Sequence, residues 1–310
     1  MNILHPEFEI TAPIFLKRGA SLAEERKNQH RSLFCIANPH GLHAEAILEA
    51  DRAGFDAILC EKPACVNLEQ LEMLQAVKTP TAILHGYRQM WGPQVMKKMI
   101  EAGELGKIIT IEGRYWQASA AEQALSSGQP KVSNNWKNDV RLSGESDTYL
   151  DLGTHLLDAI CFLHGSFTPE IQGWRSYINS GAPHRDSHVQ FEMNLPHGSR
   201  GFGSISKTVH GSPNHFEINV IGSKKYAKWE FLMADEIHLG EGKDHSVLTR
   251  ANRDIGSHQD PYHGVGWLEG YIEIAYRLIA EVFHASPTGY PSLQQDLNLL
   301  RAMFNTKWAA

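Results

Sequence analysis

The stretch Ala57-Ile58-Leu59-Cys60-Glu61-Lys62-Pro63 decides the fold of this chain. Its apolar half has the length and composition of a buried strand, and it stops abruptly at an acid, a base and a proline. In an open α/β sheet, ligands bind outside the carboxyl ends of the strands. We therefore expect Glu61 and Lys62 at the mouth of a ligand crevice, with Pro63 a candidate cis-proline. An exposed charge pair after a strand explains the same residues equally well.

Strands and helices alternate on both sides of this stretch. A second apolar run occupies residues 33–37, and an amphipathic helix over residues 42–52, ended by Gly54, lies between the two runs. A further helix is predicted around residues 68–77, and a strand at residues 81–85. Strand, helix, strand, helix, strand is the pattern of a parallel sheet with right-handed crossovers.

The pattern changes after residue 87. Helices are predicted at residues 93–102, 147–163, 267–283 and 293–308. Alternating strands are predicted at residues 107–116, 170–179, 187–195, 200–209, 215–221 and 225–232. The polar stretches at residues 117–146 and 240–263 are predicted as loops.

This order predicts an α/β unit followed by an α+β unit. Residues 1–87 are expected to form a Rossmann-type parallel sheet. Residues 88–310 are expected to form an open, mainly antiparallel sheet with flanking helices, the last of which packs back on the first unit.

The composition excludes several classes of function. A net charge of −6, without a run of basic residues, argues against nucleic acid as the main partner. No apolar run reaches ~18 residues, so no membrane span is predicted. The four cysteines, Cys35, Cys60, Cys65 and Cys161, lie in or beside apolar runs, and we expect buried, reduced thiols in a cytoplasmic protein. Their spacing fits no zinc motif, and no metal is expected.

A second group of reactive residues is Asp151-Leu152-Gly153-Thr154-His155, within the helix predicted at residues 147–163. On a regular helix, residues four apart share one face, so Asp151 is expected beside His155. An acid in that position fixes the tautomer of a histidine and raises its basicity. A surface ion pair or a buried, hydrogen-bonded histidine produces the same spacing more often.

The motifs together resemble the glucose–fructose oxidoreductase, inositol dehydrogenase and rhizopine-catabolism (Gfo/Idh/MocA) family of NAD(P)-dependent oxidoreductases. The shared order is Asn38-Pro39-x-x-x-His43, Glu61-Lys62-Pro63, the turn at residues 103–108, Trp136-Lys137 and Asp151-x-Gly153-x-His155. Each motif is short, but their joint order is specific, and the resemblance covers residues 31–310.

The resemblance implies hydride transfer between NAD or NADP and a sugar, polyol or related hydroxy compound, by a homodimer or homotetramer. It implies that Lys62 hydrogen-bonds the reacting oxygen, that His155 takes the hydroxyl proton, and that Asp151 orients His155. Which of Lys62 and His155 moves the proton stays open.

Binding residues are implied by the same resemblance. The cofactor-binding residues would be Asn38, Pro39, His43, Glu61 and Lys62. The substrate-pocket residues would be Arg88, Trp116 and Lys137, for which a role as exposed or packing side chains is an equal alternative.

One element of the family pattern is missing. The family opens with a strand and a glycine-rich turn that holds the cofactor pyrophosphate at a helix N-terminus, but this sequence contains no Gly-x-Gly-x-x-Gly. A βαβ unit takes ~30 residues, and residues 31–60 already use one such unit. We therefore predict an incomplete Rossmann-type sheet, arising from a shortened start or from divergence.

Two other functions are compatible with the sequence. A relative that binds the cofactor weakly or not at all would act as a binding module for a sugar-like ligand. A metal-dependent sugar lyase or isomerase is the third possibility, with the segment His258-Gln259-Asp260-Pro261-Tyr262-His263 joining Asp151 and His155 as metal ligands.

Overall fold

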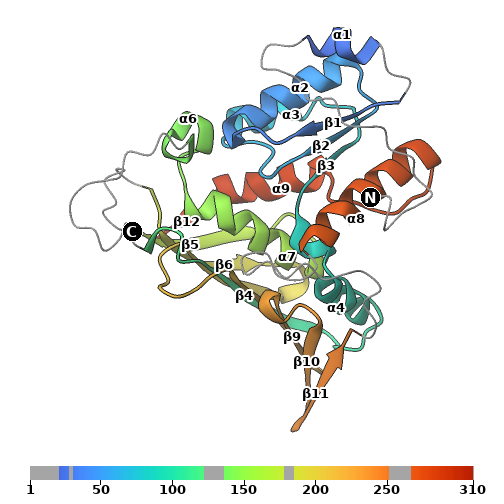
Figure 1. The fold of residues 1–310 in the computed structure, drawn as a ribbon. Coiled ribbons are helices and arrows are strands. Elements are labelled where there is room, and N and C mark those ends of the chain that lie inside the picture. Colours follow the sequence, from blue (N-terminus) through green and yellow to red (C-terminus); the bar gives the residue numbers. More distant parts are fainter. Residues whose placement is uncertain (1–20, 28–30, 122–135, 178–184, 251–266, 310) are drawn as a thin grey trace.

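The computed structural model describes residues 21–27, 31–121, 136–177, 185–250 and 267–309. These residues form a small parallel sheet and a larger mixed sheet, with helices between and around them (Figure 1). The helices are α1 (Leu22–Lys27), α2 (His43–Ala53), α3 (Leu68–Leu74), α4 (Trp91–Glu101), α6 (Val140–Ser143), α7 (Thr154–His164), α8 (Trp267–His284) and α9 (Leu293–Phe304). None of these helices has the length and apolar character needed to cross a membrane.

The small sheet has the parallel order that the alternating pattern predicted. Its strands are β1 (Leu33–Ile36), β2 (Ala57–Cys60) and β3 (Thr81–Ile83), with β2 in the centre. Burial on both faces explains the uninterrupted apolar run of β2. Gly54 ends α2 in the left-handed conformation, at φ 75°, which a glycine adopts without steric cost. The Lys62–Pro63 peptide bond that follows β2 is cis, as expected.

The cysteine prediction holds for three of the four residues. Cys60, Cys65 and Cys161 are buried, Cys35 is exposed, and all four are free thiols. Cys35 lies on β1, which is an edge strand of the sheet formed by the described residues.

The large sheet has nine strands in the order β11-β10-β9-β8-β4-β7-β6-β5-β12. Their bounds are β4 (Ile108–Trp116), β5 (Glu170–Ser176), β6 (His188–Asn194), β7 (Arg200–Ser206), β8 (His215–Gly222), β9 (Tyr226–Glu230), β10 (Glu236–Glu241), β11 (Asp244–Thr249) and β12 (Lys307–Trp308). Neighbouring strands are antiparallel except for the parallel pairs β4–β7 and β5–β12. The sheet is therefore mixed but mainly antiparallel, as the sequence predicted.

Two predicted boundaries are wrong. Residues 240–263 were expected to be a loop, but β10 and β11 form a hairpin through residue 249. All six residues of β11 are exposed, so the hairpin has no apolar face to reveal it in the sequence. The last helix ends at Phe304 instead of residue 308, because Lys307 and Trp308 pair with β5.

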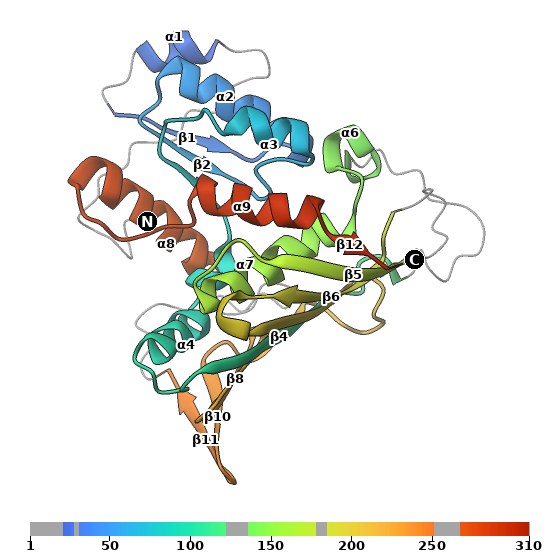
Figure 2. The same cartoon turned by 180° about the vertical axis from the view of Figure 1, so that it is seen from behind.

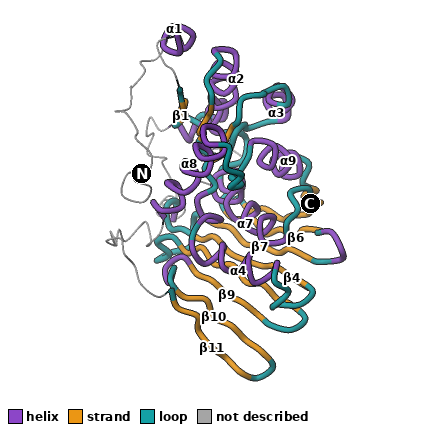
Figure 3. Tube along the Cα trace, turned by 90° about the vertical axis from the view of Figure 1, so that its right-hand side faces the viewer, coloured by secondary structure: helices purple, strands orange, loops and turns teal. Residues whose placement is uncertain are grey.

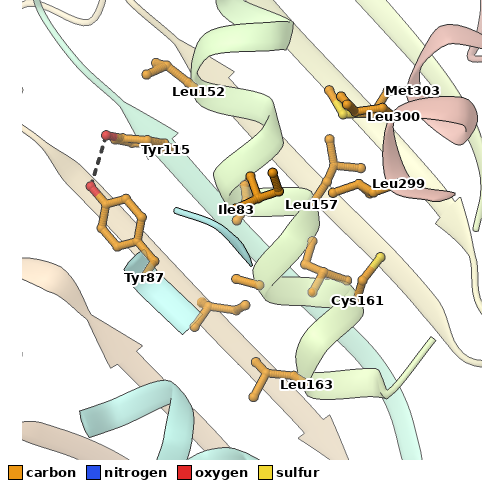
Figure 4. Close-up of a cluster of buried hydrophobic side chains, with 14 of the residues drawn as sticks. Ile83, Tyr87, Tyr115, Leu152, Leu157, Cys161, Leu163, Leu299, Leu300 and Met303 are labelled. Carbon is orange, nitrogen blue, oxygen red and sulfur yellow. Dashed lines mark hydrogen bonds between the residues drawn. The ribbon is translucent and has the colours of Figure 1, made fainter. Parts of the chain in front are cut away.

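Helices α7 and α9 lie between the two sheets (Figures 1, 2 and 3). Nine of the eleven residues of α7 are buried, as expected for a helix covered on all sides. Helix α9 packs against α3 and β3 on one side and against α7 and β5 on the other. Figure 4 shows Leu157 and Cys161 of α7 beside Leu299, Leu300 and Met303 of α9. The core is thus continuous from the small sheet to the large one.

A π-helical turn, Tyr149–Gly153, leads directly into α7. The sequence predicted one regular helix over residues 147–163. Turns of this type insert one extra residue and are frequent at functional sites. The extra residue changes the direction in which Asp151 points from the helix axis, relative to the residues that follow it.

Replacement of Gly92 by alanine should destabilise the protein by about 1–3 kcal/mol through overpacking. A Cβ on Gly92 would lie 2.0 Å from Cδ1 of Trp229. That indole is fully buried and donates from Nε1 to the Ala234 carbonyl at 3.0 Å, so it cannot move aside freely. Urea unfolding measures the change, with Lys98→Ala on the exposed side of α4 as control. Equal midpoints for the two variants would contradict the prediction.

Candidate active site

A cavity of about 660 Å³ lies beside the start of α7 and the end of β4. Most of its lining residues carry a polar group, and they come from segments far apart in the sequence. The lining residues are Tyr87, Tyr115, Gln117, Ala118, Ser119, Lys137, Asp151, His155, Ser212, Pro213, Asn214 and Tyr271.

Asp151, which lines this cavity, pairs with Lys62, which is buried and is not itself one of the lining residues. Nζ of Lys62 donates to Oδ1 of Asp151 at 2.8 Å and to the Asp151 carbonyl oxygen at 2.6 Å. Lys62 follows β2, whereas Asp151 lies in the π-helical turn before α7. The structure thus brings together two of the three predicted catalytic residues, 89 positions apart in the sequence.

Two further lysines share the Asp151 carboxylate. Its Oδ2 accepts from Nζ of Lys137 at 3.0 Å and from Nζ of Lys207 at 2.9 Å, and Lys207 also contacts Oδ1 of Asp147 at 2.7 Å. Burial alone would raise the pKa of Asp151, but Lys62, Lys207 and Lys137 hold it well below its ordinary value. Asp151 is therefore ionised over the whole working pH range.

Lys207 was not identified from the sequence. It is 6% exposed and directly follows β7, where no motif marks it. Burial acts to lower its pKa, but Asp151 and Asp147 raise that pKa above its ordinary value. Lys207 is thus a fixed positive charge beneath the cavity.

His155 lies beside these charges without pairing to them. Its Nδ1 is buried and has no hydrogen-bond partner among the described residues, and its ring centroid is 5.1 Å from that of Tyr87. The sequence placed Asp151 next to His155, but the π-helical turn directs the carboxylate of Asp151 to the lysines. Burial, followed by the charge of Lys62, lowers the pKa of His155 well below its ordinary value. The ring is therefore neutral, and its surroundings disfavour the charged imidazolium form.

Phenol and amide groups form a second wall of the cavity. Tyr87 donates to the Tyr115 hydroxyl at 3.0 Å (Figure 4), and Asn214 Nδ2 donates to the Tyr87 hydroxyl at 3.1 Å. Gln117 Nε2 donates to Oδ1 of Asn214 at 2.9 Å. Burial raises the pKa of Tyr87 to about 12, so the phenol stays protonated. Neutral donors and acceptors of this kind suit hydroxyl groups.

The residues predicted for cofactor binding lie at the ends of β1 and β2. His43 is fully buried, with Nδ1 2.7 Å from the Pro63 carbonyl oxygen and Nε2 2.8 Å from that of Asn38. It ties the ends of the two strands together. Pro39 precedes α2, and the carboxylate of Glu61 accepts from the Lys62 backbone N–H at 3.3 Å.

Two of the three predicted substrate residues do not line the cavity. Arg88 is 2% exposed and pairs with Oδ1 of Asp158 at 3.2 Å. Trp116 donates from Nε1 to the Ser204 hydroxyl at 3.0 Å and lines a separate hollow with Trp174. Both follow residues that do line the cavity, Tyr87 and Tyr115, but their side chains point elsewhere. Lys137 alone of the three lies at the cavity. The segment proposed for a metal site, residues 258–263, lies outside the described residues.

Comparison with known proteins assigns the fold. Residues 94–228 match the GFO/IDH/MocA C-terminal domain family. This segment of the chain is therefore similar to the C-terminal domain of the Gfo/Idh/MocA family. The matched segment spans α4 to β9 and contains Asp151 and His155, so this part of the site is built within the family's C-terminal domain.

The chain is also similar to two dehydrogenases and to a solved structure of an inositol dehydrogenase homologue. Levoglucosan dehydrogenase of Pseudarthrobacter phenanthrenivorans is 26% identical, over 88% of this chain and 78% of the relative. Glucose-6-phosphate 3-dehydrogenase of Bacillus subtilis is 26% identical, over 63% of this chain and 56% of the relative. An inositol dehydrogenase homologue from Azotobacter vinelandii, solved with NAD+, superposes with a TM-score of 0.76 at 24% identity, over 91% of this chain and 77% of that one. The structural match shows that the chain shares the fold of this inositol dehydrogenase homologue.

Proposed function

We propose that the protein is an oxidoreductase that transfers a hydride between NAD or NADP and a sugar, polyol or related hydroxy compound. The meeting of Lys62 with Asp151 at a polar cavity that also holds His155 carries this proposal. A concave site with a few convergent polar groups and shifted pKa values is the usual mark of an active site. The named relatives are sugar dehydrogenases, which supports the substrate class.

Each residue has a role that its contacts allow. An ammonium has three N–H donors, and Lys62 uses two of them on Asp151, which leaves one for the substrate oxygen. In the oxidation direction, the neutral ring of His155 accepts the hydroxyl proton as the C–O bond becomes a carbonyl. Asp151 fixes the direction of the Lys62 ammonium. The nicotinamide, when bound, accepts the hydride from the substrate carbon.

The described residues fit the nicotinamide end of the cofactor, and they include no glycine-rich turn for its pyrophosphate. His155 lines the cavity, and Lys62 keeps one N–H donor beyond the two that it uses on Asp151, so both suit the reacting end. The turns after β1, β2 and β3 hold two glycines. A Cβ on Gly41 would lie 2.1 Å from the Arg141 carbonyl oxygen, and one on Gly86 would lie 2.6 Å from the Tyr271 ring. At both glycines, protein atoms therefore fill the space beside the Cα atom.

We therefore predict weak cofactor binding, because a pyrophosphate cradle supplies several backbone hydrogen bonds and a helix dipole, each worth about 0.5–3 kcal/mol. Nicotinamide fluorescence during titration with NADH and with NADPH measures the affinity. Dissociation constants in the millimolar range are expected, and micromolar binding of either cofactor would contradict the prediction.

The activity itself is tested at high cofactor concentration. The chain is incubated with millimolar NAD+ or NADP+ and a panel of cyclic polyols, aldoses and anhydrosugars, and absorbance at 340 nm is followed. Turnover that depends on Lys62 is the expected result. The absence of turnover with every compound and both cofactors would overturn the proposal.

A non-catalytic binding module is the second candidate, and the filled turns at Gly41 and Gly86 favour it. Calorimetric titration with the same panel, without cofactor, separates the two functions. Sugar binding without turnover would select the binding module.

The proposal includes the organisation of the chain. We place the boundary between an incomplete Rossmann-type unit and the substrate unit at residues 87 and 88, after the last strand of the small sheet. We also propose a cytoplasmic homodimer or homotetramer that forms through the open face of the large sheet. The exposure of Trp174 (51%) and Phe202 (39%) on the described part of that face supports this assembly.

A further inference from the structure

Beneath the cavity lies a cluster of buried charged residues that the proposed chemistry does not use. Asp296 of α9, Asp158 of α7, and His85 and Arg88 of the segment after β3 are each at most 2% exposed. We name these four residues the interior charge cluster. Burial of four ionisable side chains costs folding free energy unless each side chain is paired. A functional role would explain why the protein keeps them.

The cluster joins three elements of the fold. Oδ1 of Asp296 is 2.7 Å from Nε2 of His85, and Nδ1 of His85 is 4.0 Å from Oδ2 of Asp158. Asp158 in turn pairs with Arg88 at 3.2 Å, and Arg88 donates to Gln295 of α9 at 2.8 Å. Asp158 is one helical turn after His155 on α7, so the cluster reaches the helix that carries one catalytic group.

The second oxygen of Asp296 reaches the other catalytic group. Oδ2 accepts from the backbone N–H of Ala64 at 3.0 Å, in a fully buried hydrogen bond. Ala64 is two residues after Lys62. On the preceding side, the Glu61 N–H donates to the Ile36 carbonyl at 2.9 Å, which fixes the start of the segment to β1. Asp296 thus supplies the anchor after Lys62, from a helix more than 230 positions away.

We propose that Asp296 is a positioning residue, which holds the segment of Lys62 against α7 so that Lys62 and His155 face one substrate atom. This inference rests on the proposed oxidoreductase function. Asp296 touches neither the cavity nor Lys62 itself, and it acts through the Ala64 backbone and through His85.

Stability alone does not account for this arrangement. Replacing a buried ion pair by apolar residues of similar volume is often neutral or stabilising. Such an arrangement instead fixes the relative positions of the segments that it joins. Precise positions matter for catalysis, because a displacement of a catalytic group by about 1 Å reduces the rate about 10²-fold.

The test compares Asp296→Ala with Leu300→Ala, a core truncation on the same helix that leaves the Ala64 anchor intact. Leu300 is fully buried in α9. For Asp296→Ala we expect kcat to fall about 10- to 100-fold at fixed millimolar cofactor while the KM for the polyol changes less than about threefold. Leu300→Ala should destabilise the fold to a comparable degree and leave kcat within about threefold of wild type.

Asp296→Asn provides the conservative variant. Its amide oxygen retains an acceptor for the Ala64 N–H and its NH2 group a donor for His85, so a partial recovery of kcat relative to Asp296→Ala is expected. A fall in kcat that is equal for Asp296→Ala and Leu300→Ala would overturn the proposal.

Amide hydrogen exchange makes the test independent of activity. Exchange of the Ala64 amide, relative to amides of β6, should accelerate in Asp296→Ala and not in Leu300→Ala. If wild-type protein shows no turnover, the proposed function has failed and exchange alone decides whether Asp296 orders the segment. An unchanged Ala64 rate in Asp296→Ala overturns the positioning role in either case.

Discussion

Replacement of Lys62 by methionine is expected to lower kcat about 10²- to 10⁴-fold, the usual contribution of a positioned proton donor or acceptor. Methionine has nearly the same length and no N–H donor. The reacting oxygen then loses the ammonium that Asp151 aims at it. Asp151 keeps Lys137 and Lys207 as partners, so the folded state should tolerate the change.

Initial rates at saturating polyol and fixed cofactor measure this effect, and urea unfolding reports whether the variant is folded. Lys98→Met, the same chemical change on the exposed face of α4, is the matched control and should behave as wild type. A Lys62→Met variant that is folded and retains more than about a tenth of kcat would rule out Lys62 as a catalytic residue.

Asp151→Asn is expected to destabilise the protein by about 3–5 kcal/mol at neutral pH, the usual cost of removing one partner from a buried ionic group. It leaves three ammonium groups around a neutral amide, with Asp147 the remaining carboxylate in contact with Lys207. Activity should fall as well, because Lys62 loses the acceptor that directs it.

The pH dependence of the unfolding free energy provides a second test of this prediction. The pKa of Asp151 is depressed in the folded protein, so its stabilising contribution is present above the unfolded value of about 3.9 and is lost as pH falls through the lower folded pKa. The difference in unfolding free energy between wild type and Asp151→Asn should therefore shrink toward acidic pH. Asp244→Asn on the exposed strand β11 is the control. A difference that is constant with pH would contradict the ionic origin.

The sequence alone identified the site residues that belong to short motifs. Lys62 and Asp151 each end or begin a strongly patterned element, and their motifs are contiguous in the sequence. Tyr115 and Asn214 line the cavity, and Lys207 pairs with Asp151, each from a segment separated from the others by the topology of the large sheet. Pairing of distant strands leaves no signal in one sequence, so these residues were not predicted.

The differences between the expectations and the structure have physical causes of the same kind. Arg88 was expected either in the substrate pocket or as a packing side chain, and Asp158 gives it a buried partner. The helical spacing of Asp151 and His155 assumed 3.6 residues per turn, and the π-helical turn breaks that assumption. Parallel strands were predicted correctly in the small sheet because continuous apolar runs alternate there with amphipathic helices.

The position of α9 has a consequence for how a ligand enters. Helix α9 packs against α3 and β3 on one side and α7 and β5 on the other, and β12 ties its far end to the large sheet. The small sheet cannot move away from the large sheet unless α9 loses its contacts with one of them. We therefore expect selection by fit to a preset shape, with association rates governed by access to the mouth of the cavity and little closure after the ligand arrives.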